Sequence, residues 1–530
     1  MQELITLVNL FQKTKFKVNG ILRIILGPDS EMEHLYDAIA SGAVQSDEDA
    51  RALFPEYAKK ISRLHTIKGK LKDRLNDSIL LLDFRESAFT ERQHAFYACS
   101  KKWAASMTLI SKNARENAIN LLENLLRQTL RFEFTELTLD ILRTLRLHYG
   151  ILEGDQKRFD QIGQQITTFE EYWLMERQTE GYYAELVTRF VRSKSDKDAI
   201  SEKAREYFLK IQPFLEQCDT FKVHFFGRLL EILIYDSIND YPNTARLCED
   251  ALAFFAKKDY TSSIALQVFN YNLFICYLNL KQYDKCLQLA DQNRDLFEEG
   301  SYNWFKLQEL YFLTAMHSGK FLEAWVIYQK VITHPALNNQ PQPVVELWKI
   351  FEAYTCFLNH CGRIPGSKPD SKFKLSKFLN EIQLFSKDKA GMNIPVQVIQ
   401  FLFELADGKQ LKMIDRVDNL AKYRSRYIDG EQSVRSHCFI RMLEQIPKAS
   451  FQLDEIERRT QDILEQLRNT PLETANQNHE IEIIPYDILW SITLNLLGKP
   501  PAKNSKAQTG AADLPGQQNI QDSTAAPLPR

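Results

Sequence analysis

The chain has 530 residues, of which 19 are Gly and 18 are Pro, a share well below the usual ~12% for the two together. So few turn-forming residues argue against an all-β protein, which needs a turn every ~8–12 residues. The charges balance, with 67 Lys and Arg against 69 Asp and Glu, which excludes a globally basic nucleic-acid binder and a strongly acidic disordered chain. The composition therefore predicts a mostly helical protein.

The N-terminal residues lack the basic region and the small-residue cleavage site of a signal peptide. No apolar run reaches the ~18 residues that a membrane span requires. The eight cysteines are scattered along the chain, whereas a disulfide framework would be denser. We therefore expect mostly buried, reduced thiols and a cytoplasmic protein.

Residues 1–88 are predicted to form an N-terminal helical region. Ser30 is followed three residues later by Glu33, and Ser46 by Asp49, and both pairs are typical of helix starts. Val18–Leu26 is rich in β-branched and aliphatic residues, but no partner strand is visible elsewhere, so a helix is favoured there as well.

A basic run within 59–74 carries an apolar stripe that includes Leu64, Leu71 and Leu75. Such a helix could contact nucleic acid or an anionic membrane surface. The alternative is a packed helix whose outer charges are balanced by the acidic residues at 47–49. The cations of this basic run are Lys59, Lys60, Arg63, Lys68, Lys70, Lys72 and Arg74.

Residues 89–360 have the pattern of successive helical hairpins. One apolar stripe recurs at steps of three and four residues and therefore lies on one helix face; its members are Leu266, Phe269, Leu273, Tyr277 and Leu280. After each polar turn an aromatic residue opens the second helix, at Tyr241, Tyr283 and Phe321. Gly319 in one of these turns is suited to a left-handed conformation.

Over 220–335 these hairpins resemble tetratricopeptide (TPR) repeats. The clearest match is carried by Trp304, Tyr311, Phe321, Ala324, Tyr328 and Pro335. The aromatic residues that open the second helices recur at intervals of about 40 residues, against a family period of ~34. The resemblance implies an all-α fold in which antiparallel hairpins stack into a TPR-like α-solenoid. An irregular helical array outside this family is the alternative.

In the family the first helix of each hairpin lines a concave groove. The matching positions here are Tyr271 and Asn279 in one hairpin, and Lys306, Glu309 and His317 in the next. The resemblance implies that Asn279 and Lys306 bind the backbone or a carboxylate of an extended peptide. A groove that is merely solvated, or filled by neighbouring helices, is the alternative.

Residues 361–371 contain clustered Gly and Pro and are predicted to form a loop. A C-terminal helical region is expected over 372–497, closed by a terminal helix that contains Trp490. Residues 498–530 are rich in Pro and Ala and have no aromatic residue. They cannot bury enough apolar surface to offset chain entropy, so this tail is predicted to be disordered.

The sequence contains no phosphate-binding loop, no C-x-x-C and no H-E-x-x-H, so no cofactor or metal site is predicted. Glu31 with His34, and Glu91 with His94, fit the E-x-x-H pattern of di-iron bundles, but both occupy a first helical turn, where Glu is favoured anyway. The main hypothesis is a non-enzymatic scaffold that binds a protein or peptide partner. A protein associated with nucleic acid or a membrane surface through 59–74, and a helical-bundle enzyme whose site is not visible in the sequence, are the alternatives.

Overall fold

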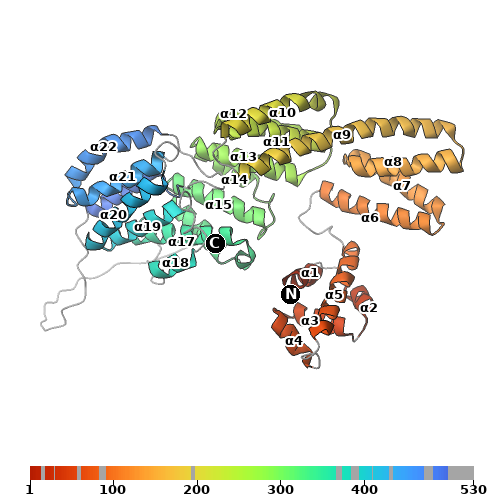
Figure 1. Ribbon diagram of the computed structural model, residues 1–530, viewed down its shortest axis with the longest axis horizontal. Coiled ribbons are helices and arrows are strands. Elements are labelled where there is room, and N and C mark those ends of the chain that lie inside the picture. Colours follow the sequence, from red (N-terminus) through yellow and green to blue (C-terminus); the bar gives the residue numbers. More distant parts are fainter. Residues whose placement is uncertain are drawn as a thin grey trace, which may run out of the picture. The chain divides into compact units, whose positions relative to one another are not determined.

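The computed structural model describes residues 1–13, 18–28, 30–55, 61–82, 91–192, 197–365, 373–382, 393–408, 410–428, 434–470 and 482–498. These residues form 23 α-helices and no strand (Figure 1), which confirms the all-α prediction. Within them, no helix combines the length and the apolar character needed to cross a bilayer. The predicted disordered tail, apart from Gly498, lies outside the described residues.

The chain divides into two compact units. The first contains residues 1–352 together with 472–483, and the second contains 353–471 together with 484–530. Of the stretch 472–483, only Glu482 and Ile483 lie within the described residues. The boundaries expected from the sequence, including the loop at 361–371, stay predictions.

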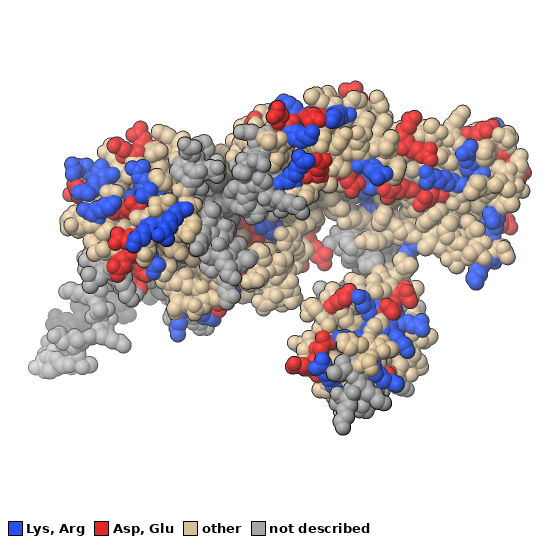
Figure 2. Space-filling model, viewed as in Figure 1, with Lys and Arg blue, Asp and Glu red and all other residues tan. Residues whose placement is uncertain are grey.

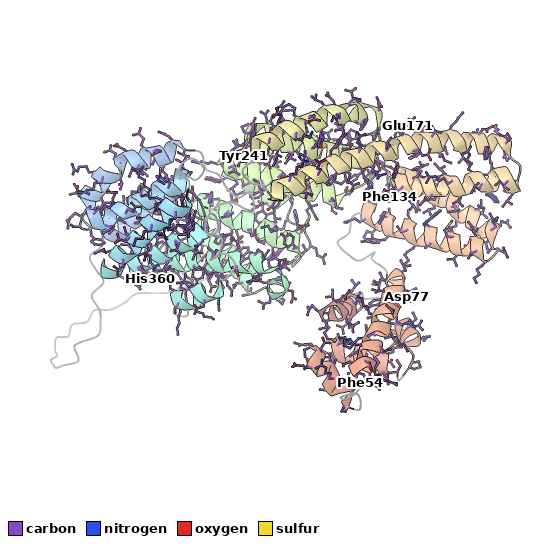
Figure 3. The ribbon with its side chains drawn as sticks, in the orientation of Figure 1. Phe54, Asp77, Phe134, Glu171, Tyr241 and His360 are labelled. Carbon is purple, nitrogen blue, oxygen red and sulfur yellow. The ribbon has the colours of Figure 1, made fainter. Side chains whose placement is uncertain are left out.

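Five helices at the N-terminus share one core: α1 (Gln2–Lys13), α2 (Val18–Leu26), α3 (Glu31–Ala40), α4 (Asp47–Leu53) and α5 (Ile61–Ser78). The helix predicted over Val18–Leu26 is confirmed. The predicted cap at Ser30 accepts a hydrogen bond from the backbone N–H of Glu33, and Ser46 with Asp49 forms a complete capping box. Phe54, at the end of α4, is buried in this core (Figure 3).

Five further helices follow: α6 (Glu91–Ser111), α7 (Arg115–Arg131), α8 (Thr135–Leu147), α9 (Gln156–Arg192) and α10 (Lys197–Gln217). Each packs against the next. Helix α9 has 37 residues and contributes to two separate cores, through Ile166 beside α8 and through Leu186 beside α10. The sequence analysis did not anticipate a helix of this length.

The hairpin region consists of α11 (Phe221–Asp236), α12 (Tyr241–Phe255), α13 (Ser263–Asn279), α14 (Tyr283–Gln292), α15 (Tyr302–His317) and α16 (Phe321–Ile332). Consecutive helices are in contact. Tyr241 (Figure 3), Tyr283 and Phe321 are the first residues of α12, α14 and α16, so the three predicted helix starts are confirmed.

The turns of these hairpins explain how the chain forms so many helices with so little glycine. Gly319 has a φ of 74°, as the sequence predicted, but Asn239 and Lys281 adopt the same left-handed region with φ of 60° and 57°. The residue after each of them donates its N–H back to the helix, as Gln282 does to the Tyr277 carbonyl at 2.8 Å. Non-glycine residues thus close turns that glycine usually closes.

The second unit begins within α17 (Gln342–His360) and contains α18 (Leu375–Glu381), α19 (Asn393–Ala406), α20 (Gln410–Tyr427), α21 (Val434–Lys448), α22 (Leu453–Asn469) and α23 (Tyr486–Leu497). The predicted terminal helix is confirmed as α23. It packs against α19, α21 and α22, with Trp490 buried and Tyr486 stacked on Phe439 at a ring separation of 4.4 Å.

Candidate peptide-binding face

The groove residues predicted on α13 are largely enclosed. Asn279 is buried near the end of the helix, where its Nδ2 donates to the Ile275 carbonyl one turn earlier at 2.9 Å. Tyr271 is half-buried. Tyr271 is one of the groups that raise the pKa of Lys306 on α15. The Asn279 Nδ2 therefore donates within its own helix, while Tyr271 interacts electrostatically with Lys306 of the next predicted site.

Lys306 and Glu309 form an ion pair one turn apart on α15. The Lys306 Nζ contacts Glu309 Oε2, and the two side chains are only 15% and 6% exposed. The other carboxylate oxygen, Glu309 Oε1, is buried with no hydrogen-bond partner among the described residues. Glu309 Oε1 can accept a hydrogen bond from the N–H of an amide group, and the Lys306 ammonium group can donate one to the carbonyl of an amide.

The electrostatics of this pair reflect its burial. Burial raises the pKa of the Glu309 carboxyl group, and Lys306 only partly counteracts that effect. Burial by itself lowers the pKa of Lys306, but the attraction of Glu309 and Tyr271 outweighs it, so the net pKa is raised. Lys306 therefore stays an ammonium that can donate hydrogen bonds.

His317, the last residue of α15, is buried and contacts a distant part of the chain. Its Nε2–H donates to the backbone carbonyl of Glu482 at 2.5 Å. Because a carbonyl oxygen only accepts, this contact requires a proton on Nε2. Glu482 lies outside any helix, in the stretch that belongs to the first unit. His317, one of the predicted groove residues, thus already donates a hydrogen bond to the backbone of a residue outside any helix.

The three α15 residues lie along one side of that helix. Lys306 and His317 are eleven residues apart, which corresponds to about three turns, or roughly 16 Å along the axis. Glu309 lies one turn from Lys306 on the same side. We call the surface formed by Lys306, Glu309 and His317 the α15 face.

The basic run predicted around α5 is largely compensated by acidic neighbours. Arg63 pairs with Glu31 of α3 at 3.0 Å, Lys68 with Asp47 of α4, and Lys72 with Glu3 of α1 at 2.7 Å. Lys70 and Arg74 are exposed, and Lys59 and Lys60 lie outside the described residues. Figure 2 shows basic and acidic side chains intermixed over these helices. The pairing favours the alternative of a packed, charge-balanced helix.

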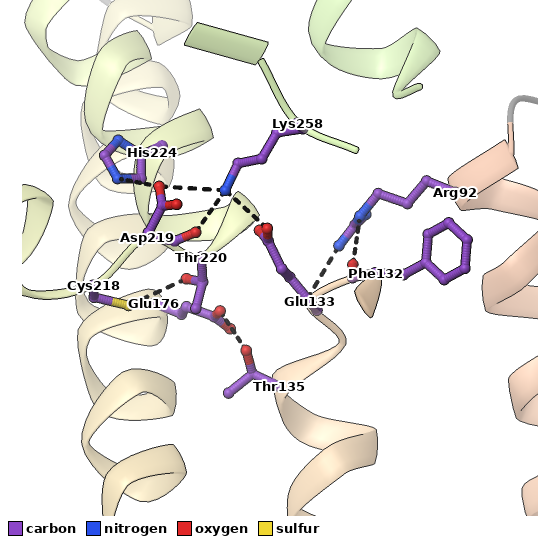
Figure 4. A network of polar contacts seen from close by, with 10 residues as sticks. All are labelled: Arg92, Phe132, Glu133, Thr135, Glu176, Cys218, Asp219, Thr220, His224 and Lys258. Atoms are coloured by element: carbon purple, nitrogen blue, oxygen red, sulfur yellow. Dashed lines mark hydrogen bonds and ion pairs between the residues drawn. The ribbon is translucent and has the colours of Figure 1, made fainter. Parts of the chain in front are cut away.

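A second cluster of charges, which the sequence analysis missed, joins the turns of several hairpins (Figure 4). Arg92, at the start of α6, donates to the carbonyls of Phe132 and Glu133 at 3.0 and 3.3 Å. Lys258 pairs with the Glu133 carboxylate at 2.8 Å and donates to the Asp219 carbonyl at 2.7 Å. We call Arg92, Glu133, Asp219 and Lys258 the turn cluster. It connects segments that are far apart in the sequence.

Burial shifts the pKa values of the ionisable groups next to the turn cluster in the direction that favours their neutral forms. Burial lowers the pKa of His224, which contacts Asp219 at 3.4 Å, to about 4. Burial raises the pKa of Glu176, although Thr135 donates to it at 2.6 Å. Burial also raises the pKa of the Cys218 thiol, whose described contact is with Thr220. These features are typical of interior packing and not of an activated nucleophile.

The two E-x-x-H motifs have carboxylates that are engaged in ion pairs. Glu31 pairs with Arg63, and Glu91 pairs with Arg131 at 2.8 Å. Within the described part of the chain, no group of three or more His, Cys, Asp or Glu could hold a metal ion. The structure thus brings together Lys306, Glu309 and Tyr271, and it adds the His317 contact to Glu482.

Comparison of the chain with protein-family models, with curated proteins and with solved structures gives no match. The likeness to tetratricopeptide repeats therefore stays a prediction, and the function must be argued from the site.

Proposed function

We propose that this protein is a non-enzymatic helical scaffold that binds a non-helical segment of a protein partner along the α15 face. The observation that carries the proposal is the hydrogen bond from His317 to the backbone carbonyl of Glu482. A backbone carbonyl is common to every peptide. A residue that holds one at the end of α15 is therefore suited to hold another chain in the same way.

Recognition at this face is proposed to need hydrogen bonds and shape alone. A peptide amide N–H can donate to Glu309 Oε1, and the neighbouring carbonyl can accept from Lys306 or His317. Tyr271 adds an aromatic surface beside Lys306. No bond is made or broken in the ligand.

The stacking of the hairpins into a TPR-like solenoid belongs to the same proposal. It is supported by consecutive helix contacts from α11 to α16 and by the aromatic residues that open α12, α14 and α16. A cytoplasmic location is also proposed, and the free state of all eight cysteines supports it.

Site-specific photo-crosslinking tests the proposal. A photoreactive phenylalanine analogue replaces Tyr271 in the full chain, produced in its native cells, and mass spectrometry identifies the segment that becomes attached. The same analogue at Leu174, which is exposed on α9, is the matched control. We expect one protein to be captured through a defined segment at 271 only. Equal capture at 271 and 174, or none at 271, would contradict the proposal.

A further inference from the structure

The stretch that contacts His317 has properties of a bound ligand. Glu482 and Ile483, the described residues of the stretch 472–483, belong to the first unit, whereas Ile484 and helix α23 belong to the second. Within that stretch Glu482 and Ile483 are both buried. A glutamate is almost never buried without being specifically accommodated. The contact with His317 therefore involves a backbone whose side chains are enclosed as well.

We infer that Glu482 and Ile483 act as an intramolecular ligand of the α15 face, so that a protein partner must displace them to bind. This inference rests on the proposed function and adds its regulation and the class of its partner. The carbonyl of Glu482 would occupy the His317 donor in the free protein. The partner carbonyl would take its place in the complex.

The burial of both side chains indicates the chemistry of the partner. A surface that encloses a glutamate followed by an isoleucine is complementary to an acidic residue followed by a β-branched aliphatic one. The local sequence repeats this pattern, with Glu480-Ile481 before Glu482-Ile483. We therefore expect the partner to present a non-helical acidic–aliphatic segment whose sequence is similar to that of residues 479–486.

Covalent attachment makes such a ligand an effective competitor. A short tether holds the ligand at an effective concentration in the millimolar range. Against a free peptide with a dissociation constant of about 10 μM, occupancy in cis would weaken the apparent affinity by roughly 100-fold. Undocking the segment should restore most of that factor.

The test measures binding of a fluorescent synthetic peptide, with the sequence of residues 479–486, to the full chain by fluorescence anisotropy. The proteins compared are wild type, Ile483→Ser, Ile483→Ser with His317→Leu, and Ile492→Ser. Ile492 is a buried isoleucine of α23, so its substitution is a matched control for general loosening. Circular dichroism confirms that each variant keeps its helix content. If Ile483→Ser does not, Ile483→Ala replaces it, with an expected gain of about tenfold.

We expect the peptide to bind Ile483→Ser at least 30-fold more tightly than wild type or Ile492→Ser, and to lose binding when His317→Leu is added. Equal binding to wild type and Ile483→Ser, equal gain in Ile492→Ser, or no binding to any of the four proteins would overturn the inference. If photo-crosslinking at position 271 captures a partner but the peptide binds none of the proteins, only the inference of an intramolecular ligand would be rejected. If neither partner capture nor peptide binding is observed, the proposed function would be rejected as well.

Discussion

Two pairs of largely enclosed opposite charges in the first unit differ in what they connect. In the turn cluster, Lys258 reaches Glu133, which is 125 residues away, and also binds the Asp219 carbonyl. On the α15 face, Lys306 pairs with Glu309 only three residues away, within one helix. The first pair holds distant turns together, whereas the second does not join separate elements. A charge pair that is costly to bury and contributes little to the fold is a candidate for function.

The largest expected effect comes from the Lys258→Met substitution. It removes the charge but keeps most of the stem, and it leaves the Glu133 carboxylate in a mostly enclosed site. We expect the free energy of unfolding to fall by about 3 kcal/mol, as measured by denaturant titration. Lys330→Met is the matched control, since the Lys330–Glu299 pair is 50% and 57% exposed, against 9% and 19% for Lys258 and Glu133. The control should lose less than about 1 kcal/mol. Equal losses would show that the turn cluster has no special structural role.

A second effect concerns acid stability next to the turn cluster. The pKa of His224 is lowered to about 4, against about 6.5 in the unfolded chain. The unfolded state therefore binds more protons between these values, and the protein loses stability as pH falls from 6.5 toward 4. We expect His224→Gln to recover about 2 kcal/mol relative to wild type across this window, measured by denaturation at pH 7 and pH 4.5. His65→Gln, at an exposed position on α5, is the control. A constant difference between His224→Gln and wild type at both pH values would refute the assignment.

A smaller effect is expected at His317. Replacing it with Leu removes the donor to Glu482, a loss of about 1 kcal/mol. Amide hydrogen exchange in the peptide that covers 482–486 should then accelerate about fivefold, because that segment opens more often. His317→Gln retains a donor and should show a smaller acceleration. Unchanged exchange in the Leu variant would mean that this hydrogen bond does not hold the segment.

The smallest effect on stability is expected where the effect on binding is largest. The double variant Lys306→Met, Glu309→Leu replaces a local ion pair by apolar side chains of similar size. We expect the free energy of unfolding to stay constant or rise by up to about 1 kcal/mol. Partner capture at position 271 should nevertheless disappear. A loss of stability as large as that of Lys258→Met would remove the contrast between the two regions.

Local patterns in the sequence predicted those features that depend on neighbouring residues. The aromatic residues at 241, 283 and 321 predicted helix starts, and Ser30 and Ser46 predicted caps, because the interactions concerned span three or four residues. Helical periodicity likewise placed Lys306, Glu309 and His317 on one helix. It gave no information about their burial.

The features that the sequence analysis missed depend on contacts between distant residues. Lys258 and Glu133 are 125 residues apart, and His317 and Glu482 are 165 apart. Neither pairing leaves a local signal. The turns at Asn239 and Lys281 were also hard to read as left-handed, because the conformation that Gly usually marks is adopted there by other residues. The length of α9 was missed because its apolar residues serve two cores in succession.

Helix α9 also limits how this sequence can change over time. Its 37 residues span about 55 Å without a turn, with Ile166 in one core and Leu186 in another. A single inserted residue between these positions would rotate one half by about 100° against the other, so both sets of apolar residues could not stay buried. Substitutions on the exposed side of α9 do not change this rotational alignment of its two halves. We therefore expect related sequences to vary at the exposed positions of α9 but to keep the number of residues between Ile166 and Leu186 constant.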